Sequence, residues 1–324
     1  MQTMHVNEAK ASMDHIYDNP DPREYFRELG SLDYTLPGVA KHLFQVLISH
    51  LQRNREEAVN ILDLGCSYGV NAALLKHDLS MKDLYRRWGQ ERFEDATSEE
   101  VLASDRKFFS RAPEHEDIRV LGLDAAENAV VYAEDAGLLD EGLVVDLESE
   151  SLPAPGAADL MPVNLVISTG CVGYVTDTTF HRLVPAVLQG ESPWFANFAL
   201  RTFSFEAIAR VLADSDYVTE KLEGCTFKQR RFVSTQEQEA FVRQVESRGL
   251  DASGKEADGY SHAEFYLSRP KEEAESTPIE AFFRLASSAS GAFPDIDDGS
   301  HPVVRVDGQP PVGLDGSPES GAPR

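Results

Sequence analysis

The sequence contains few cysteines and no long apolar run. Only Cys66, Cys171 and Cys225 occur among its 324 residues, and no two of them form a C-x-x-C pair. An odd number of widely spaced cysteines argues against a disulfide framework or a zinc cluster, so we expect no metal site and a reducing, cytoplasmic location. No run of about 18 apolar residues is present, and residues 1–10 lack the apolar segment of a signal peptide. These absences argue against a membrane-spanning or exported protein.

Basic residues are scarce relative to acidic ones. The chain has 30 Lys and Arg against 55 Asp and Glu, which gives a formal net charge of −25. Such a surface repels phosphate backbones and anionic lipid, so we expect neither a nucleic acid nor a membrane as partner. We interpret the two compact basic stretches, 85–88 and 228–232, as solvated faces. Hydrophobic residues make up 42% of the chain, which is enough for a sizeable core.

Three regions of the chain differ in composition. Residues 1–57 are rich in tyrosine and proline, which predicts an arm or lid of extended and turn geometry that ends in one helix. Residues 58–270 alternate strand-like and helix-like runs, which predicts one α/β domain. Residues 271–324 hold seven of the 17 prolines and are predicted to be a mostly disordered tail. Within that tail, residues 278–287 could form a short helix that docks on the body.

The strand-like runs are short and apolar, and helical patterns separate them. This alternation is typical of a mostly parallel sheet with helices on both faces. The last two runs alternate apolar and polar residues, which predicts an antiparallel strand pair at one edge. Seven strands are therefore expected, at 58–65, 118–125, 141–148, 163–170, 193–200, 225–234 and 262–270.

A glycine-containing turn follows the first predicted strand. The stretch NILDLGCSYGVNAALL, residues 60–75, places Asp63 at the strand end and Gly65, Ser67 and Gly69 in the turn. Such a turn lets a ligand approach the backbone, and the helix after it offers free N–H groups. The dinucleotide fingerprint G-x-G-x-x-G is not met, because a serine and a valine replace its second and third glycines. We expect the serine to be tolerated through its small side chain and a negative φ.

Three later strands also end in residues suited to a nucleoside ligand. A carboxylate at the end of the second strand, here Asp124, can accept hydrogen bonds from both ribose hydroxyls. With the turn, these strand ends resemble the ordered motifs of class I S-adenosylmethionine-dependent methyltransferases across about residues 58–270. The resemblance implies a Rossmann-like seven-stranded fold, S-adenosylmethionine as cofactor, and a turn that holds its methionine end. It implies cofactor contacts from Asp63, Gly65, Cys66, Ser67 and Gly69 in the turn, from Asp124, Ala125, Asp146, Leu147, Ser168 and Thr169 at the later strand ends, and from Tyr17 in the arm.

The spacing between two of these motifs is unusually long. Asp124 follows Gly69 by 55 residues, whereas roughly 20 separate the corresponding positions in dinucleotide-binding folds. Residues 78–117 therefore form an insertion after the first strand–helix unit, and their pattern is helical and charged. We favour a surface subdomain or a homodimer contact for it, and the alternative is a wall of the acceptor pocket.

Three residues are candidates for the acceptor pocket. Tyr174 follows the fourth strand, and Arg201 follows the fifth, where a guanidinium could clamp a substrate carboxylate. Tyr34 belongs to the arm, whose aromatic rings would favour a sulfonium cation if the arm closes over the site. Simple packing of the arm is the alternative, and no catalytic residue is assigned.

The resemblance implies methyl transfer to a small-molecule acceptor, with oxygen or nitrogen as the expected acceptor atom. In-line displacement requires mainly alignment of the reactants, and a general base only if the acceptor atom carries a proton. A nonenzymatic cofactor-binding protein, a protein methyltransferase and a nicotinamide-dependent oxidoreductase remain alternatives. Neither His181 nor His262 has an acid partner in the sequence that would indicate a Ser-His-Asp hydrolase.

Overall fold

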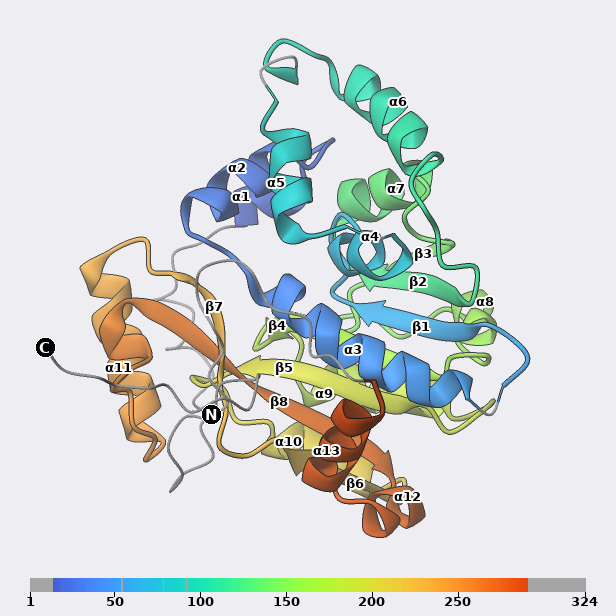
Figure 1. Cartoon of the computed structure of the whole chain (residues 1–324), viewed down its shortest axis with the longest axis vertical. Helices are drawn as coiled ribbons and strands as arrows, with labels where there is room; N and C mark the ends of the chain where they lie inside the picture. Colours follow the sequence, from blue (N-terminus) through green and yellow to red (C-terminus); the bar gives the residue numbers. More distant parts are fainter. Residues whose placement is uncertain (1–13, 54, 78, 91–92, 291–324) are drawn as a thin grey trace, which may run out of the picture.

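Eight strands form one mixed sheet in the computed structural model, which describes residues 14–53, 55–77, 79–90 and 93–290 (Figure 1). The strand order is β3-β2-β1-β4-β5-β8-β6, and β7 also pairs with β8. Strands β1 to β5 pair in parallel, and β8 runs antiparallel to its neighbours. The strands are β1 (Val59–Leu64), β2 (Ile118–Asp124), β3 (Glu141–Val144), β4 (Leu165–Val172), β5 (Trp194–Leu200), β6 (Tyr217–Lys221), β7 (Phe227–Arg231) and β8 (Tyr260–Pro270).

Two short strands share the seventh position of the sheet. β6 pairs with one half of β8, with Val218 opposite Arg269, and β7 pairs with the other half, with Phe227 opposite Ala263. The predicted mostly parallel sheet with an antiparallel edge is therefore confirmed. β6 was not predicted, because its sequence YVTEK is short and ends in three polar residues.

Helices cover both faces of the sheet and bury two separate apolar clusters. Neighbouring residues of β1 point to opposite faces, so Ile61 belongs to one cluster and Leu62 to the other. Full burial of such a side chain stabilises the fold by about 1.5–3 kcal/mol. One face carries α3 (Leu36–Gln52), α4 (Val70–Lys76) and α7 (Glu127–Asp135), and the other carries α8 (Ala154–Asp159), α9 (Asp177–Val187) and α10 (Glu206–Ala213).

The insertion between α4 and β2 contains helices α5 (Met81–Trp88) and α6 (Ser98–Phe109), and each begins with a capping box. Asp105 of α6 is completely buried. It accepts hydrogen bonds from Arg87 at 2.7 Å, from the indole of Trp88 at 2.8 Å and from Tyr132 of α7. These bonds join both insertion helices to the body of the domain.

The N-terminal arm contains two helices before α3, namely α1 (Asp14–Tyr17) and α2 (Arg23–Ser31). The proline-rich stretch was expected to have extended or turn geometry, so α2 corrects that prediction. Pro22 stands at the N-cap of α2, where its ring angle suits a helix and no intrahelical N–H bond is lost. Helix α2 buries Tyr25, Phe26 and Leu29.

Two helices follow β8, where the sequence predicted the start of a disordered tail. They are α12 (Lys271–Ser276) and α13 (Ile279–Ser290), and the short helix predicted at 278–287 falls almost entirely within α13. Phe282 and Phe283 are buried, and the guanidinium of Arg269 bonds the carbonyl of Thr277 at 2.8 Å. The rest of the predicted tail, 291–324, lies outside the described residues.

Within the described ranges no helix has the length and apolar character required to cross a bilayer. The remaining helix, α11 (Thr235–Ser247), packs against β8.

Candidate functional site

The turn between β1 and α4 is shaped by two glycines. Gly65 and Gly69 have φ angles of +75° and +72°, a region that other residues rarely adopt. A Cβ on Gly65 would lie 2.7 Å from the Cβ of Cys171 at the end of β4, so only glycine allows this approach. Cys66 is buried, and burial raises the pKa of its thiol well above the usual range. The thiol is therefore protonated, and the backbone of Cys66 bonds Leu123 and Gly69.

Ser67 adopts a left-handed backbone conformation, as Gly65 and Gly69 of the same turn do. Its φ is +47°, so the expected negative φ is wrong. The Ser67 N–H donates to Oδ2 of Asp124 at 2.9 Å. Its hydroxyl oxygen is buried and has no hydrogen-bond partner among the described residues. The turn thus holds a strained serine at its centre, with an unsatisfied hydroxyl.

Asp124 connects the turn to the end of β2. Its other oxygen, Oδ1, accepts from the N–H of Ala126 at 3.1 Å. Burial raises the pKa of this carboxyl, and the backbone N–H groups of Ser67 and Ala126 oppose the rise. The neighbouring Ala125 is exposed. The structure therefore brings Asp124, the residue predicted to bind the ribose, against Ser67 of the predicted turn, although these two residues lie 57 positions apart in the sequence.

Asp63 is the most deeply buried acid of the site. Its Oδ1 accepts from the amide of Asn71 at 2.9 Å, and the same amide donates to Oγ1 of Thr169 at 3.0 Å. The second oxygen, Oδ2, is buried and has no partner among the described residues. Burial raises the pKa of Asp63 to about 7, the Asn71 bond opposes this rise, and the charge of Asp124 adds to it. Asn71 was missed from the sequence, because an asparagine in the first turn of a helix gives no specific signal.

Strand β4 extends further than predicted. It continues to Val172, so Ser168 lies inside the strand and not at its end. The Ser168 hydroxyl is completely buried and donates to Asn197 of β5 at 2.8 Å. The Ser168 hydroxyl is therefore bonded to a neighbouring strand of the sheet. Thr169 is half-buried, and its hydroxyl oxygen accepts from the Asn71 amide.

Asp146 lies two residues beyond the end of β3. Its carboxylate accepts from the N–H of Glu148 at 3.0 Å and from the hydroxyl of Ser149 at 2.7 Å. Leu147 is buried, and its carbonyl accepts from Arg182 at 2.6 Å. These bonds fix the loop after β3 beside the edge that carries Asp124.

The N-terminal arm crosses the turn. The Tyr68 hydroxyl accepts from the N–H of Asn19 at 2.7 Å and donates to the Asn19 carbonyl at 3.0 Å. Asp18 accepts from the N–H of Asn128 at the start of α7 at 2.7 Å. The arm is therefore bonded both to the turn after β1 and to the helix after β2, across the edge where the predicted nucleoside site lies.

Tyrosines of the arm gather beside the end of β4. The ring of Tyr17 packs edge-on against Tyr25, with centroids 5.8 Å apart, and Tyr25 and Tyr34 share a side-chain hydrogen bond. Tyr34 also lies near Cys171. Burial raises the pKa of Tyr25 and Tyr34 well above the usual range, so both hydroxyls stay protonated. Tyr174 lies in the turn after β4 with 41% of its surface exposed.

Arg201 does not form the predicted substrate clamp. Its side chain is buried, pairs with Glu256 and donates to the carbonyl of Asp251 at 2.8 Å. The guanidinium is thus paired with an internal acid, a pairing that no sequence pattern predicts, while its Nε has no partner among the described residues. It positions the segment before β8 and leaves little surface for a ligand.

No family model and no curated protein matches the sequence. Solved structures that resemble the chain include the plantazolicin methyltransferase BpumL in complex with SAH, at 11% identity over 82% of this chain and 97% of that chain, with a TM-score of 0.43. A SAM dependent methyltransferase from Aquifex aeolicus is 12% identical over 80% and 99% of the two chains, with a TM-score of 0.35. The [4+2]-cyclase SpnF is 12% identical over 69% and 80%, with a TM-score of 0.34. The strand order, with β8 antiparallel to β5, is the Rossmann-like arrangement of class I S-adenosylmethionine-dependent methyltransferases, and this is the fold of the chain.

Proposed function

We propose that the chain binds S-adenosylmethionine at the carboxyl edge of β1, β2 and β4 and transfers its methyl group to a small-molecule acceptor. One observation carries the proposal. Two buried polar atoms at this edge, Oδ2 of Asp63 and Oγ of Ser67, have no partner among the described residues. Leaving such a group unpaired costs about 1–3 kcal/mol, and a hydrogen-bonding group of a bound ligand would remove that cost.

The residues present fit the parts of this cofactor. Oδ2 of Asp63 can accept a hydrogen bond from the amino group of the methionine end, beside the turn formed by Gly65 and Gly69. The carboxylate of Asp124 accepts backbone N–H groups of Ser67, Ala126 and Ala125, and its remaining acceptor capacity can take a ribose hydroxyl. Asp146, held beside this edge, is the candidate partner for the adenine amino group.

The protein's part in the reaction is alignment and exclusion of water. When bound, S-adenosylmethionine supplies a methyl group that its sulfonium already activates. The arm is bonded to the turn through Asn19 and to α7 through Asp18, so it can cover the donor side and hold reactants together. The rings of Tyr17, Tyr25 and Tyr34 lie on this arm, and aromatic faces favour a neighbouring cation.

The acceptor in this proposal is a small molecule with a reacting oxygen or nitrogen. The net charge of −25 opposes a nucleic acid or an anionic membrane as substrate. The proposal includes a reducing, cytoplasmic setting, which suits three cysteines that are all free. A homodimer through the insertion also stays a proposal.

The direct test is methyl transfer from isotope-labelled S-adenosylmethionine to pooled small molecules, followed by mass spectrometry. We expect a labelled product with the wild type and none with Asp124→Ala, which removes the ribose acceptor. Binding of S-adenosylhomocysteine without transfer to any acceptor would favour a nonenzymatic cofactor-binding protein. Label found only in added proteins would favour a protein methyltransferase, and NADH binding without affinity for S-adenosylhomocysteine would favour an oxidoreductase.

A further inference from the structure

The carboxyl end of β4 is partly exposed beside the proposed cofactor site. Thr169, Gly170 and Cys171 are half-buried, whereas the residues of β4 before them are buried. The hydroxyl oxygen of Thr169 accepts from the amide of Asn71, which also bonds Asp63. Ligands of open α/β sheets lie outside the carboxyl ends of the strands. In the proposed function, the methyl acceptor therefore lies beside this end of β4.

Gln229 of β7 lies against the same end of β4. Its Nε2 is 2.9 Å from the position that a Cβ on Gly170 would occupy, and the φ of Gly170 is +83°, so glycine allows this approach. On the other side of the amide, Oε1 accepts from the hydroxyl of Ser261 at 2.9 Å. Gln229 is only 9% exposed, and Ser261 is completely buried. The serine therefore orients the amide so that its N–H donors face β4.

The N-terminal arm meets both strands at this point. The N–H of Thr35 donates to the backbone carbonyl of Gln229 at 2.8 Å. The neighbouring Tyr34 lies near Cys171 of β4. Three segments that are distant in the sequence, namely the arm, β4 and β7, therefore converge around the Gln229 amide.

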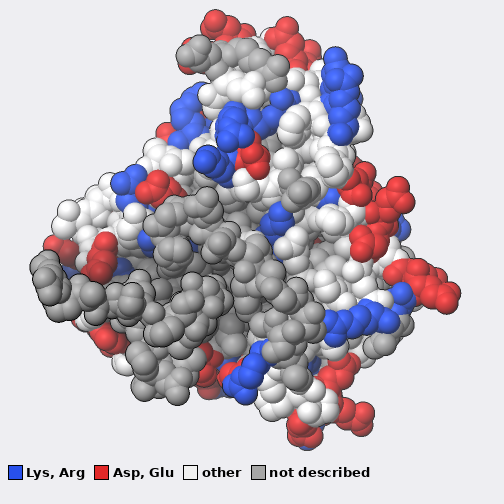
Figure 2. Space-filling model, in the orientation of Figure 1, with Lys and Arg blue, Asp and Glu red and all other residues white. Residues whose placement is uncertain are grey.

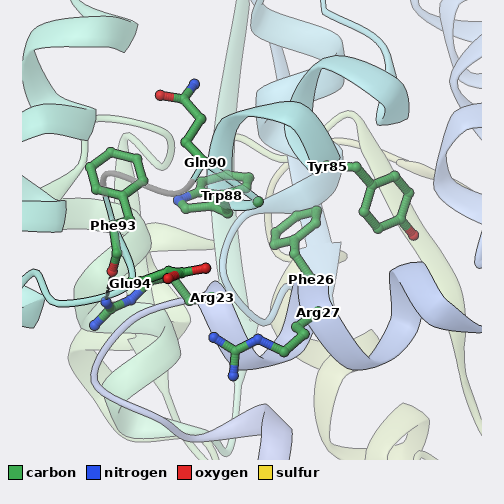
Figure 3. Close-up of a pocket in the computed structure, with 9 residues that line it drawn as sticks. Arg23, Phe26, Arg27, Tyr85, Trp88, Gln90, Phe93 and Glu94 are labelled. Carbon is green, nitrogen blue, oxygen red and sulfur yellow. Dashed lines mark hydrogen bonds between the residues drawn. The ribbon is translucent and has the colours of Figure 1, made fainter.

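Helix α5 of the insertion holds this part of the arm from the outside. The hydroxyl of Tyr85 donates to the carbonyl of Tyr34 at 2.6 Å. The ring of Phe26 lies between those of Trp88 and Tyr85 (Figure 3), with centroid distances of 4.3 Å and 5.6 Å. These contacts fix the arm where it borders Gln229, so the amide is held in place before a ligand binds.

The cations of β7 and of the end of β5 are engaged by other groups. In β7 the contacts are Lys228 with the ring of Tyr260, Arg230 with Glu237, and Arg231 with Asp33. Arg201 at the end of β5 pairs with Glu256. The basic side chains that gather over α2 and α5 lie on the outer surface (Figure 2), where Arg27 and Arg86 are both 65% exposed. The amide of Gln229 is therefore a neutral donor in surroundings that offer a carboxylate little compensation.

Three acids lie along this edge of the sheet. Asp63 and Asp124 stand at the ends of β1 and β2, and Asp146 follows β3. A carboxylate on the acceptor would be repelled by these acids. A carbonyl oxygen has no net charge and accepts an amide N–H. The edge therefore favours an acceptor with an uncharged carbonyl group.

We propose that Nε2 of Gln229 donates a hydrogen bond to an uncharged carbonyl oxygen of the methyl acceptor and so selects neutral amides or esters over carboxylates. The inference rests on the proposed function and deepens it. Gln229 contacts the acceptor, and Ser261 is a positioning residue that fixes the amide. The neutral donor takes the role that the sequence analysis gave to the guanidinium of Arg201.

Matched pairs of probes test this selection in the transfer assay with labelled S-adenosylmethionine. Salicylamide and salicylate offer a hydroxyl oxygen as acceptor, and anthranilamide and anthranilate offer a nitrogen. The pooled small molecules are divided into neutral carbonyl compounds and carboxylates, with one member of each pair in either half. We expect label in the neutral half, and label confined to the carboxylates would overturn the inference.

Two glutamine variants form a matched pair for the labelled neutral compound. Gln229→Met keeps the length of the side chain and removes its donors, while the Ser261 hydroxyl retains the Arg230 carbonyl at 3.2 Å. We expect Gln229→Met to raise KM about 5- to 10-fold and to change kcat about twofold at most, because the bond is present in both the ground state and the transition state. Gln244→Met alters a half-buried glutamine of α11 and should leave KM unchanged.

Ser261→Ala tests the positioning role. It should raise KM about 2- to 4-fold in the wild-type background and leave it unchanged in the Gln229→Met background, because its effect acts through the amide. An equal rise in both backgrounds would overturn the positioning role.

Titration with S-adenosylhomocysteine separates this inference from the proposed function. The wild type, Gln229→Met and Gln244→Met should bind it equally, and a loss confined to Gln229→Met would place Gln229 in the cofactor site and overturn the acceptor role. Transfer by the wild type with an unchanged KM in Gln229→Met contradicts only the role of Gln229. The absence of transfer by the wild type to either half of the pool contradicts the proposed function and, with it, the acceptor role.

Discussion

Replacement of Asp63 by asparagine is expected to stabilise the fold at high pH and to weaken the cofactor site. Burial raises the pKa of Asp63 from the ordinary value of 3.8 to about 7. The folded protein therefore holds this proton more tightly than the unfolded chain does. Ionisation of the buried carboxyl lowers the free energy of unfolding. This loss is absent below about pH 4, grows as the pH rises, and reaches its full size above about pH 7. Three pKa units correspond to about 4 kcal/mol at most.

The variant keeps the acceptor for Asn71 and removes the charge. Between pH 5 and pH 8 the free energy of unfolding of Asp63→Asn should therefore gain about 2–3 kcal/mol relative to the wild type. Urea denaturation at both pH values measures the difference between the two proteins, which cancels the general effect of the large negative charge. Asp146→Asn is the control for removing one charge at the same edge. Equal pH dependence of wild type and Asp63→Asn would refute the reasoning.

Ligand binding should respond in the opposite direction to stability. A ligand ammonium group favours the ionised form of Asp63, so the affinity for S-adenosylhomocysteine should rise as the pH increases through 7. Asp63→Asn should lose this dependence and at least tenfold in affinity at pH 8, which corresponds to about 1.4 kcal/mol. Isothermal titration at three pH values measures this. A stabilised variant with undiminished affinity would remove Asp63 from the site.

Three further variants test individual contacts. Ser67→Gly should raise the free energy of unfolding by about 1 kcal/mol, because relief of the left-handed strain and of the buried hydroxyl exceeds the entropy cost of glycine. Ser67→Ala keeps the strain and should raise the free energy of unfolding by less. Equal gains in the two variants would contradict this reasoning. Arg201→Met should lower the free energy of unfolding by about 3–5 kcal/mol in chemical denaturation, because Glu256 is left buried without its partner. A loss below about 1 kcal/mol would show that the pair is not buried in solution. Tyr68→Phe removes the bonds to Asn19 and should speed amide exchange across the arm while β5 stays protected, and unchanged exchange in the arm would show that these bonds do not hold it.

The sequence located the strand ends of the site because they depend on local patterns. A buried apolar run followed by an acid predicts the end of a parallel strand, and this applied to Asp63 and Asp124. Parallel neighbours then bring such ends to one edge of the sheet, so the bond between Asp124 and Ser67 followed from topology. The backbone conformation of Ser67 was predicted wrongly: its φ is +47°, and its N–H bonds Asp124, which lies 57 residues later.

Other features depend on partners that are distant in the sequence. Arg201 is held by Glu256, which lies 55 residues later, and no periodic pattern connects the two. Asn71 gains its role only after β1 and β4 place Asp63 and Thr169 on either side of it. Helix α2 was not predicted, because the prolines stand just before it. At that position a proline is compatible with the start of a helix as well as with a turn. The packing of α2 against α5, where Phe26 stacks on Trp88, is also a contact that neither segment predicts alone.

Isothermal titration of the full chain with S-adenosylhomocysteine, in parallel with Asp124→Ala, tests the central claim most directly. The account predicts one binding site per chain in the wild type and loss of measurable binding in the variant, with the variant still folded by circular dichroism. Equal affinity in the two proteins would contradict the ribose assignment. No binding by the wild type, at ligand concentrations up to the millimolar range, would contradict the cofactor site itself.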